Sequence, residues 1–290
     1  MKILVTGSYG QLGNEIARIS KTLPNWHFLF TDVDTLNIAD ENELLAYFEK
    51  HNPEYVINCA AYTAVDKAES EVELAGKVNA LAPAILAKNA KNTRAKFIHI
   101  STDYVFDGKG HRPYSEKDKV DPQNVYGRTK LQGEIEALRE NPEALIIRTS
   151  WLYSSFGNNF VKTMMRLGSE RESLKVVFDQ IGSPTYAGDL AEVILEIIKL
   201  TEVDSKKFFP GIYHYSNEGV ASWYDFAIAI FEIAGVDCKV FPVLSEEFPT
   251  PARRPNFSVL NKVKIKETYN IDIPYWKDSL KICIEKLKNI

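Results

Sequence analysis

The stretch Lys2-Ile3-Leu4-Val5-Thr6-Gly7-Ser8-Tyr9-Gly10-Gln11-Leu12-Gly13 joins an apolar run to three glycines. The apolar run predicts a β-strand, and the 3.6-residue spacing of apolar side chains after it predicts a helix. Gly7 lets the chain turn sharply, Gly10 allows a pyrophosphate to approach, and Gly13 lets the helix pack closely on the sheet. The free amides at the start of that helix suit phosphate groups. The stretch therefore predicts a dinucleotide site; the alternative is an ordinary glycine-rich turn between a strand and a helix.

Short apolar runs and amphipathic segments alternate through the first half of the chain. Asp40 can cap the second helix, and Glu43 can complete a capping box there. Strands that alternate with helices imply right-handed crossovers and a parallel sheet covered on both faces. We therefore predict an α/β fold with a Rossmann-type, doubly wound parallel sheet. Strands are expected over 2–6, 26–31, 55–58, 96–101 and 144–149, and helices over 10–21, from 41, over 69–91 and over 126–139.

Beyond Trp151 this alternation loosens. Helices are expected over 157–166, 186–200, 222–234 and 275–288, with a strand over 174–178. Residues 1–150 are predicted to form the dinucleotide-binding domain, with later segments near 174–215 completing it. Residues 151–290 are predicted to be mainly a smaller substrate-binding lobe, interleaved with the first domain.

The composition excludes several classes of protein. The 290 residues are 45% hydrophobic and 26% charged with a net charge of −4, which argues against a nucleic-acid or anionic-membrane binder. Three widely spaced cysteines, Cys59, Cys238 and Cys283, indicate reduced thiols. The five histidines show no metal-ligand spacing, so no metal site is expected. With no signal peptide and no apolar window of membrane-spanning length, we expect a cytoplasmic protein.

An acidic residue follows the second predicted strand. Asp32 lies 19 residues beyond Gly13, where a carboxylate can accept hydrogen bonds from adenosine ribose hydroxyls and repel a 2′-phosphate. The first loop contains no arginine that would bind such a phosphate. The sequence therefore favours NADH, with NADPH still usable; Asp34 is a competing candidate for the ribose contact.

Tyr126 and Lys130 are one helical turn apart, so a phenol and an ammonium can project from the same face. A neighbouring cation favours the ionised phenol, so Lys130 is expected to lower the Tyr126 pKa and ease proton exchange. Thr102 stands at the end of the fourth strand, where its hydroxyl can polarise a substrate carbonyl. The pattern predicts reduction of a ketone by a reduced nicotinamide, with Tyr126 as proton donor. The alternatives are a half-exposed helix pair and a threonine that only forms a turn.

Taken together, these motifs resemble the extended short-chain dehydrogenase/reductase family over essentially the whole chain. Within that family they are similar to the branch that reduces the C4 ketone of dTDP-4-dehydro-L-rhamnose and so completes dTDP-L-rhamnose, a nucleotide sugar for cell-surface polysaccharides. The matching stretches are 7–13, 60–69, 101–108, 124–130, 148–151 and 157–160.

The resemblance also implies roles for individual residues. Tyr126, Lys130 and Thr102 would be catalytic, and Thr102, Asp103, Trp151 and Arg254 would contact the dTDP-sugar substrate. The alternative for Trp151 is a core anchor, and for Arg254 a surface charge. Tyr126 and Lys130 would also contact the cofactor, together with Gly7, Gly10, Gln11, Leu12, Gly13, Asp32, Asn37, Ile38, Ala61, Tyr62 and Thr63.

Two departures from the family pattern bear on the cofactor and the assembly. Asn37 stands where relatives often carry Asp, which affects the expected ribose contact. Some relatives dimerise around Mg²⁺, and Glu15 matches one such ligand. Gly188 stands at the position of another, so we do not expect a Mg²⁺-bridged dimer. A monomer and a homodimer both remain open.

Two other functions fit parts of the same pattern. A sugar-nucleotide dehydratase or epimerase of the same superfamily is one, but dehydratases place a Glu after Thr-Asp where this chain has Tyr104. The other is a non-catalytic regulatory subunit, like the β subunit of methionine adenosyltransferase, which would bind a dinucleotide and a protein partner without turnover.

Overall fold

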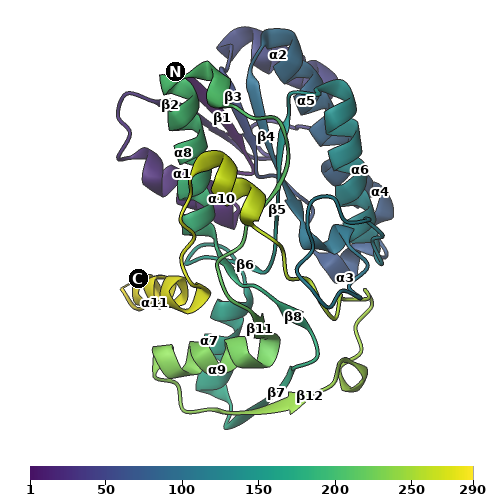
Figure 1. Cartoon of the computed structure of the whole chain (residues 1–290), viewed down its shortest axis with the longest axis vertical. Coiled ribbons are helices and arrows are strands. Elements are labelled where there is room, and N and C mark those ends of the chain that lie inside the picture. The colour runs from purple at the N-terminus through teal and green to yellow at the C-terminus, as the bar shows by residue number, and fades with distance from the viewer. Residues whose placement is uncertain (290) are drawn as a thin grey trace.

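The computed structural model describes residues 1–289 and places a six-stranded parallel sheet at the centre of the larger part of the molecule (Figure 1). The strand order is β10-β5-β4-β3-β1-β2. This arrangement confirms the predicted Rossmann-type parallel sheet. The strands are β1 Lys2–Thr6, β2 His27–Thr31, β3 Tyr55–Asn58, β4 Lys96–Thr102, β5 Leu145–Thr149 and β10 Gly211–His214.

Helices cover both faces of this sheet, which explains why its strands read as nearly continuous apolar runs. On β1, Ile3, Leu4 and Val5 are all fully buried. One face packs against α1 and α8, and the opposite face packs against α2, α5 and α6 (Figure 1). These helices are α1 Gln11–Ser20, α2 Glu41–His51, α5 Ala82–Thr93, α6 Val125–Glu140 and α8 Ala187–Val203.

The sheet has its topological switch at β1. β2 pairs with one side of β1 and β3 with the other, so the connections leave the carboxyl ends of these strands in opposite directions. In open α/β sheets the crevice at such a point binds ligands. Gly7 follows β1 at this position and Cys59 follows β3.

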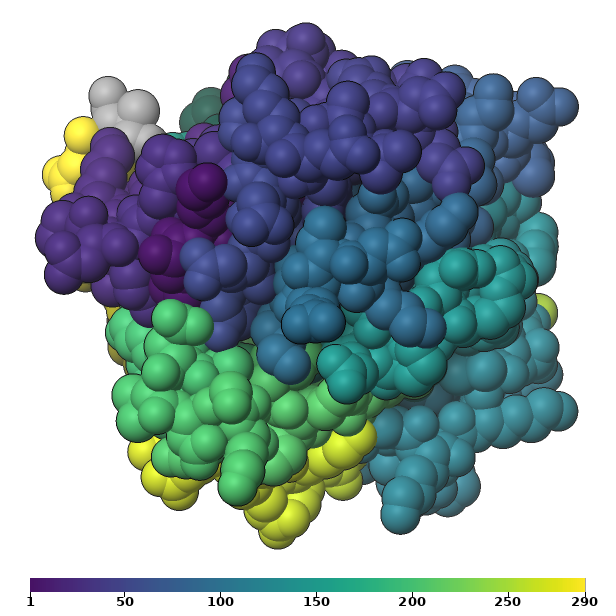
Figure 2. Space-filling model, turned by 90° about the horizontal axis from the view of Figure 1, so that it is seen from above, coloured from purple at the N-terminus to yellow at the C-terminus, as the bar shows by residue number. Residues whose placement is uncertain are grey.

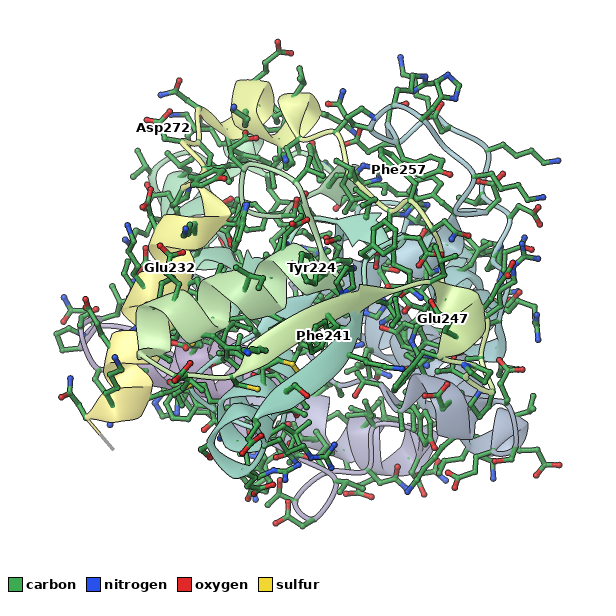
Figure 3. All side chains as sticks on the ribbon, turned by 90° about the horizontal axis from the view of Figure 1, so that it is seen from below. Tyr224, Glu232, Phe241, Glu247, Phe257 and Asp272 are labelled. Carbon is green, nitrogen blue, oxygen red and sulfur yellow. The ribbon has the colours of Figure 1, made fainter. Side chains whose placement is uncertain are left out.

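Below the sheet lies a smaller lobe with its own apolar core, to which α7, α9 and α11 contribute buried residues (Figure 1). Figure 3 shows this lobe from below, with Tyr224 and Glu232 on α9 and Phe241 on β12. β7 pairs with β12 in this lobe and not with the main sheet, whereas α8 and β10, from the same predicted 174–215 region, complete the sheet domain. The domain boundary near residue 150 stays a prediction. The lobe elements are β6 Leu152–Tyr153, α7 Phe160–Glu170, β7 Ser173–Val177, β8 Ile181–Gly182, β9 Thr185–Tyr186, β11 Ala221–Ser222, α9 Trp223–Ala234, β12 Lys239–Val243 and α11 Trp276–Lys288.

Seen from above, residues near 200–210 (green) lie beside the N-terminal residues (purple), although the two segments are far apart in the sequence (Figure 2). The Tyr55 hydroxyl donates a hydrogen bond of 2.8 Å to Glu202 there. Short helices complete the chain: α3 Val65–Ala68, α4 Val72–Gly76, the 3-10 turns Asp103–Val105, Ser205–Lys207 and Ser245–Glu247, and α10 Val263–Tyr269.

Two local predictions were wrong in detail. The helix expected over 69–91 is interrupted by a π-turn at Lys77–Leu81. Pro83 explains this, because it lacks the N–H that would bond the Asn79 carbonyl in an α-helix. At α2, Asp40 caps the helix as expected, but the Glu43 carboxylate accepts the Asn37 N–H at 3.0 Å, so the capping box is not completed.

None of the helices within residues 1–289 is long and apolar enough to cross a membrane. All three cysteines are free, as expected for reduced thiols.

Candidate active site

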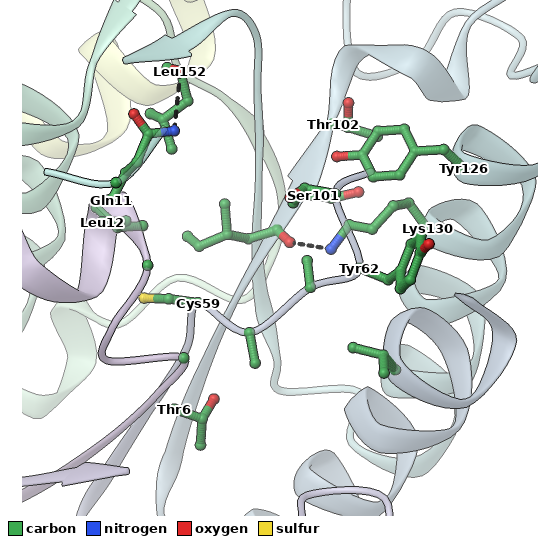
Figure 4. A pocket seen from close by; sticks show the side chains of 18 of the residues that line it. Thr6, Gln11, Leu12, Cys59, Tyr62, Ser101, Thr102, Tyr126, Lys130 and Leu152 are labelled. Atoms are coloured by element: carbon green, nitrogen blue, oxygen red, sulfur yellow. Dashed lines mark hydrogen bonds between the residues drawn. The ribbon is translucent and has the colours of Figure 1, made fainter. Parts of the chain in front are cut away.

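A cavity of about 900 Å³ runs along the carboxyl ends of the strands, between the sheet domain and the lobe (Figure 4). Its walls come from the glycine turn after β1, the ends of β2, β3 and β4, the start of α6, and two tryptophans near the lobe. All of the predicted site residues except Gly13 and Arg254 line it. Residues from the strand ends, from α6 and from the lobe, which are far apart in the sequence, therefore line one cavity.

The glycine turn has the geometry that its sequence predicts. Gly7 adopts φ +69°, and a Cβ there would lie 2.6 Å from the Ala60 backbone. Gly13 lies outside the cavity, but a Cβ on it would collide with the Gly7 carbonyl and with Ser8. Only glycine at both positions lets α1 begin directly against the turn. The resulting opening, lined by Gly10, fits a pyrophosphate at the helix N-terminus.

Asp32 closes the turn at the end of β2. Its Oδ2 accepts the Tyr9 N–H at 2.8 Å and its Oδ1 accepts the Val33 N–H at 2.8 Å. Because a carboxylate has about four acceptor positions, both oxygens can still accept from a ligand in the cavity. Asp34 accepts the Tyr9 hydroxyl at 3.2 Å and does not line the cavity, whereas Asn37 does.

The loop after β3 carries Ala61, Tyr62 and Thr63 along the cavity wall. Asn79 fixes this loop: its Oδ1 accepts the Tyr62 N–H at 2.8 Å and its Nδ2 donates to the Tyr62 carbonyl at 3.1 Å. Asn79 is buried in the π-turn, and its Nδ2 also donates to Thr129 at 3.1 Å. The interrupted helix thus supports the part of the wall predicted to contact the cofactor.

Several side-chain oxygens at the ends of β4 and β5 have no hydrogen-bond partner within the described chain. Thr102 Oγ1 donates to Asp103 Oδ1 at 3.0 Å. Ser101 Oγ, Asp103 Oδ2 and Thr149 Oγ1 are buried and make no hydrogen bond within the described chain. Buried polar atoms normally have partners. The three residues line the cavity, but these oxygens are themselves buried behind its surface. Burial raises the pKa of Asp103 to about 6.

Tyr126 and Lys130 both project from α6 into the cavity, as the spacing predicts. The expected lowering of the Tyr126 pKa by Lys130 is not found: burial raises it to about 12, partly offset by the Thr102 hydroxyl. Burial is the reason for this rise. The Lys130 amine is engaged elsewhere, since its Nζ donates to the Ile100 carbonyl at 2.6 Å (Figure 4).

The lobe side of the cavity holds residues that the sequence analysis did not single out. Trp223, at the start of α9, stacks on Trp151 and lines the cavity. Asn159 Nδ2 donates to Gln11 Oε1 at 2.9 Å, which joins the lobe to the first helix. Trp223 has no local sequence signal, because its position depends on a contact between segments far apart in the chain. Asn159 lies in a stretch quoted above for the family resemblance.

Two other residues lie elsewhere in the fold. Arg254 is not on the cavity wall; its guanidinium pairs with Asp66 at 2.7 Å, so its substrate contact stays a prediction. Glu15 is buried and pairs with Arg18 at 2.8 Å and with the Ser154 hydroxyl at 2.7 Å.

The parallel sheet, the glycine turn and the phenol and amine on one helix define a Rossmann-type oxidoreductase of the short-chain dehydrogenase/reductase class. The family model described as the RmlD substrate binding domain matches residues 1–289, and the chain belongs to this family.

Similar proteins support this assignment over the full length. The dTDP-4-dehydrorhamnose reductase of Aggregatibacter actinomycetemcomitans is 41% identical over 288 residues, covering 97% of each chain. A crystal structure of the enzyme of that name from Clostridium acetobutylicum has a TM-score of 0.94 and 46% identity, covering 99% of this chain and 100% of the other. The one from Bacillus anthracis, in complex with NADP, has a TM-score of 0.93 and 37% identity, covering 98% and 99%.

Proposed function

We propose that this chain reduces the C4 ketone of dTDP-4-dehydro-β-L-rhamnose to give dTDP-β-L-rhamnose, with a reduced nicotinamide dinucleotide as hydride source. The single observation that carries the proposal is the shared cavity. It places the glycine turn for a pyrophosphate and the Thr102–Tyr126 pair for a ketone in one continuous space. Family members of similar length are named for this reaction.

Each of several residues that line the cavity has a separate role in the proposed reduction. A bound reduced nicotinamide supplies hydride to the ketone carbon. Tyr126, with its pKa raised to about 12, keeps its proton at neutral pH and can donate it to the oxygen that develops negative charge. Thr102 polarises the same oxygen by a hydrogen bond. Asp103 and Lys130 both line the cavity, and we assign Asp103 to a sugar hydroxyl and Lys130 to the nicotinamide ribose.

NADH is the proposed preferred cofactor. The Asp32 carboxylate lines the cavity at the end of β2, where it favours ribose hydroxyls and repels a 2′-phosphate. The Bacillus anthracis relative was crystallised with NADP, so NADPH is the second candidate. A cytoplasmic location, and action as a monomer or homodimer without a bridging Mg²⁺, belong to the same proposal.

The reaction is tested by mixing the purified protein with NADH or NADPH and dTDP-4-dehydro-L-rhamnose, and following the loss of reduced-nicotinamide absorbance. Tyr126→Phe should lower the rate by about a hundredfold or more, the usual contribution of a general acid, while cofactor binding persists. Tyr47→Phe, on α2 outside the cavity, is the matched control and should behave like the parent. A Tyr126→Phe enzyme as fast as the parent overturns the assignment of the acid.

The same assay separates the two alternative functions. A non-catalytic regulatory subunit would bind the dinucleotide but show no turnover with any dTDP-sugar. A dehydratase would convert a dTDP-hexose by loss of water without net consumption of the reduced cofactor. Consumption of one reduced nicotinamide for each ketone reduced excludes both.

A further inference from the structure

A chain of buried polar side chains runs behind the cavity, from the first strand of the sheet to the amine on α6. Thr6, Asn58 and His99 lie on β1, β3 and β4, and Lys130 follows on α6. Asn58 and His99 are fully buried, and Lys130 is 2% exposed. His99 does not line the cavity, so the function proposed above leaves it without a role.

The directions of the hydrogen bonds in this chain are fixed by a backbone amide. The Ala60 N–H can only donate, and it lies 3.1 Å from one side-chain atom of Asn58, which must therefore be the carbonyl Oδ1. Thr6 Oγ1 donates to the same oxygen at 2.8 Å. The Asn58 amide nitrogen consequently faces His99 Nδ1, at 3.0 Å.

This arrangement assigns the tautomer of the imidazole. Because the Asn58 Nδ2 group is a donor, His99 Nδ1 has to be the acceptor. A neutral imidazole that accepts at Nδ1 carries its proton on Nε2. The charged form is disfavoured, because its Nδ1–H would point at the Asn58 amide hydrogens. Burial and the nearby Lys130 hold the His99 pKa well below its usual value, which agrees with a neutral imidazole.

The Nε2–H of His99 faces Lys130 Nζ across 3.5 Å, while Nζ donates to the Ile100 carbonyl at 2.6 Å. An N–H directed at an amine opposes the ammonium form, which has no lone pair, and favours the neutral amine, which can accept. Burial lowers the Lys130 pKa to about 8, and the negative charge of Glu134 opposes this shift.

Three titratable groups interact with Lys130 from the surrounding elements: His99 from β4, Cys59 after β3, and Glu134 from its own helix. Glu134 is already paired with Arg148 at 2.6 Å. The Cys59 pKa is raised by burial, so its thiol is neutral at physiological pH. His99 is therefore the neutral neighbour whose dipole acts directly on the amine.

We propose that His99 is a positioning residue that, as its Nε2–H tautomer, orients the Lys130 amine against the Ile100 carbonyl and favours its neutral form. The tautomer and the effect on Lys130 follow from the fold alone. The consequence for the rate rests on the proposed function: His99 sets the pH at which Lys130 changes charge, and so the basic limb of the pH profile.

The tautomer is tested on the parent protein without substrate. In protein labelled with ¹⁵N-histidine, the signal that is lost in His99→Asn should show a neutral imidazole protonated at Nε2 throughout pH 6 to 8. An imidazole protonated at Nδ1, or one that becomes charged in this range, overturns the proposal. The measurement needs no activity, so its failure is distinct from failure of the proposed function.

The effect on the amine is tested with His99→Asn, whose shorter carboxamide can still accept from Asn58 but has no N–H at the former Nε2 position. In protein labelled with ¹³C-lysine, the Lys130 Cε signal, assigned by its loss in Lys130→Met, should titrate higher in the variant by on the order of one pH unit. The basic limb of kcat should move by the same amount.

His214→Asn is the matched control, because His214 is a fully buried histidine on β10 outside the cavity. It should leave the Lys130 titration unchanged. An unchanged midpoint in His99→Asn, or an equal shift in both variants, overturns the proposal. If His99→Asn does not fold, the histidine signals of the parent, assigned with His99→Gln, decide the tautomer.

Discussion

The indoles of Trp151 and Trp223 stack with their centroids 3.6 Å apart and their planes 8° from parallel. Trp151 follows β5 with a left-handed φ of +47°, and Trp223 begins α9 in the lobe. Gly182 completes the contact, since a Cβ there would lie 2.6 Å from the Trp151 ring. A left-handed non-glycine residue costs about 1–3 kcal/mol and persists only when its surroundings hold it. The lobe thus fixes an indole at the part of the cavity that we propose for the substrate.

Replacing Trp223 by leucine should therefore weaken substrate binding. Loss of the stack, worth about 0.5–1.5 kcal/mol, should raise KM for the sugar nucleotide by up to about tenfold and leave KM for the cofactor unchanged. Steady-state kinetics with each substrate varied in turn measure both constants. Tyr224→Leu, the next residue on α9 and outside the cavity, should change neither. If KM for the cofactor rises instead, Trp223 contacts the cofactor and not the sugar nucleotide.

Much of the cavity was predictable because its residues follow strands. Gly7, Asp32 and Thr102 stand at or just after strand ends, and parallel strands bring all their carboxyl ends to one edge of the sheet. Tyr126 and Lys130 follow from the helical period. These features depend on local patterns plus one rule of topology.

The remaining features depend on contacts between distant segments or on burial. Trp223 reaches the cavity only because the lobe folds beneath the sheet. Asn79 does not line the cavity, and it supports the wall only through its hydrogen bonds to the Tyr62 backbone, 17 residues away. The Tyr126 pKa was predicted with the wrong sign, because burial raises it and sequence spacing shows that a lysine is near but not how deeply the phenol is buried.

Asp32→Ala tests the cofactor preference. The parent should show the higher kcat/KM with NADH, and the variant should lose most of that preference because the charge that repels a 2′-phosphate is gone. Competition kinetics with the two cofactors give the ratio directly. Asp34→Ala removes a neighbouring charge that does not line the cavity and should leave the ratio nearly as it was. A parent enzyme that strongly prefers NADPH would refute the proposed preference.

Arg148→Met tests the buried ion pair behind α6. Arg148 donates to both carboxylate oxygens of Glu134, at 2.9 and 2.6 Å, and both side chains are at most 3% exposed. Removing one partner leaves an unpaired buried charge, so the free energy of unfolding in urea should fall by about 3–5 kcal/mol. The double variant Arg148→Met/Glu134→Leu should recover much of this loss.

A surface pair provides the comparison for that experiment. Arg166→Met removes a solvent-exposed partner of Glu170 on α7 and should cost less than about 1 kcal/mol. If Arg148→Met and Arg166→Met lower the free energy of unfolding equally, the burial of the Arg148–Glu134 pair does not increase the cost of breaking it.

Asp103→Asn should stabilise the protein, and more so as the pH rises. The Asp103 pKa is raised from 3.8 to about 6 by burial, so the folded state favours the protonated carboxyl. Its favourable contribution is complete below pH 3.8 and is lost as the pH rises through 6. The asparagine cannot ionise, so its advantage over the parent should grow to at most about 3 kcal/mol at pH 8. Urea unfolding at pH 4, 6 and 8 measures the trend, and Asp107→Asn should show the opposite one, because a hydrogen bond from Tyr114 lowers the Asp107 pKa. A stability difference between Asp103→Asn and the parent that stays constant with pH would mean that folding does not raise the Asp103 pKa, and would contradict the prediction.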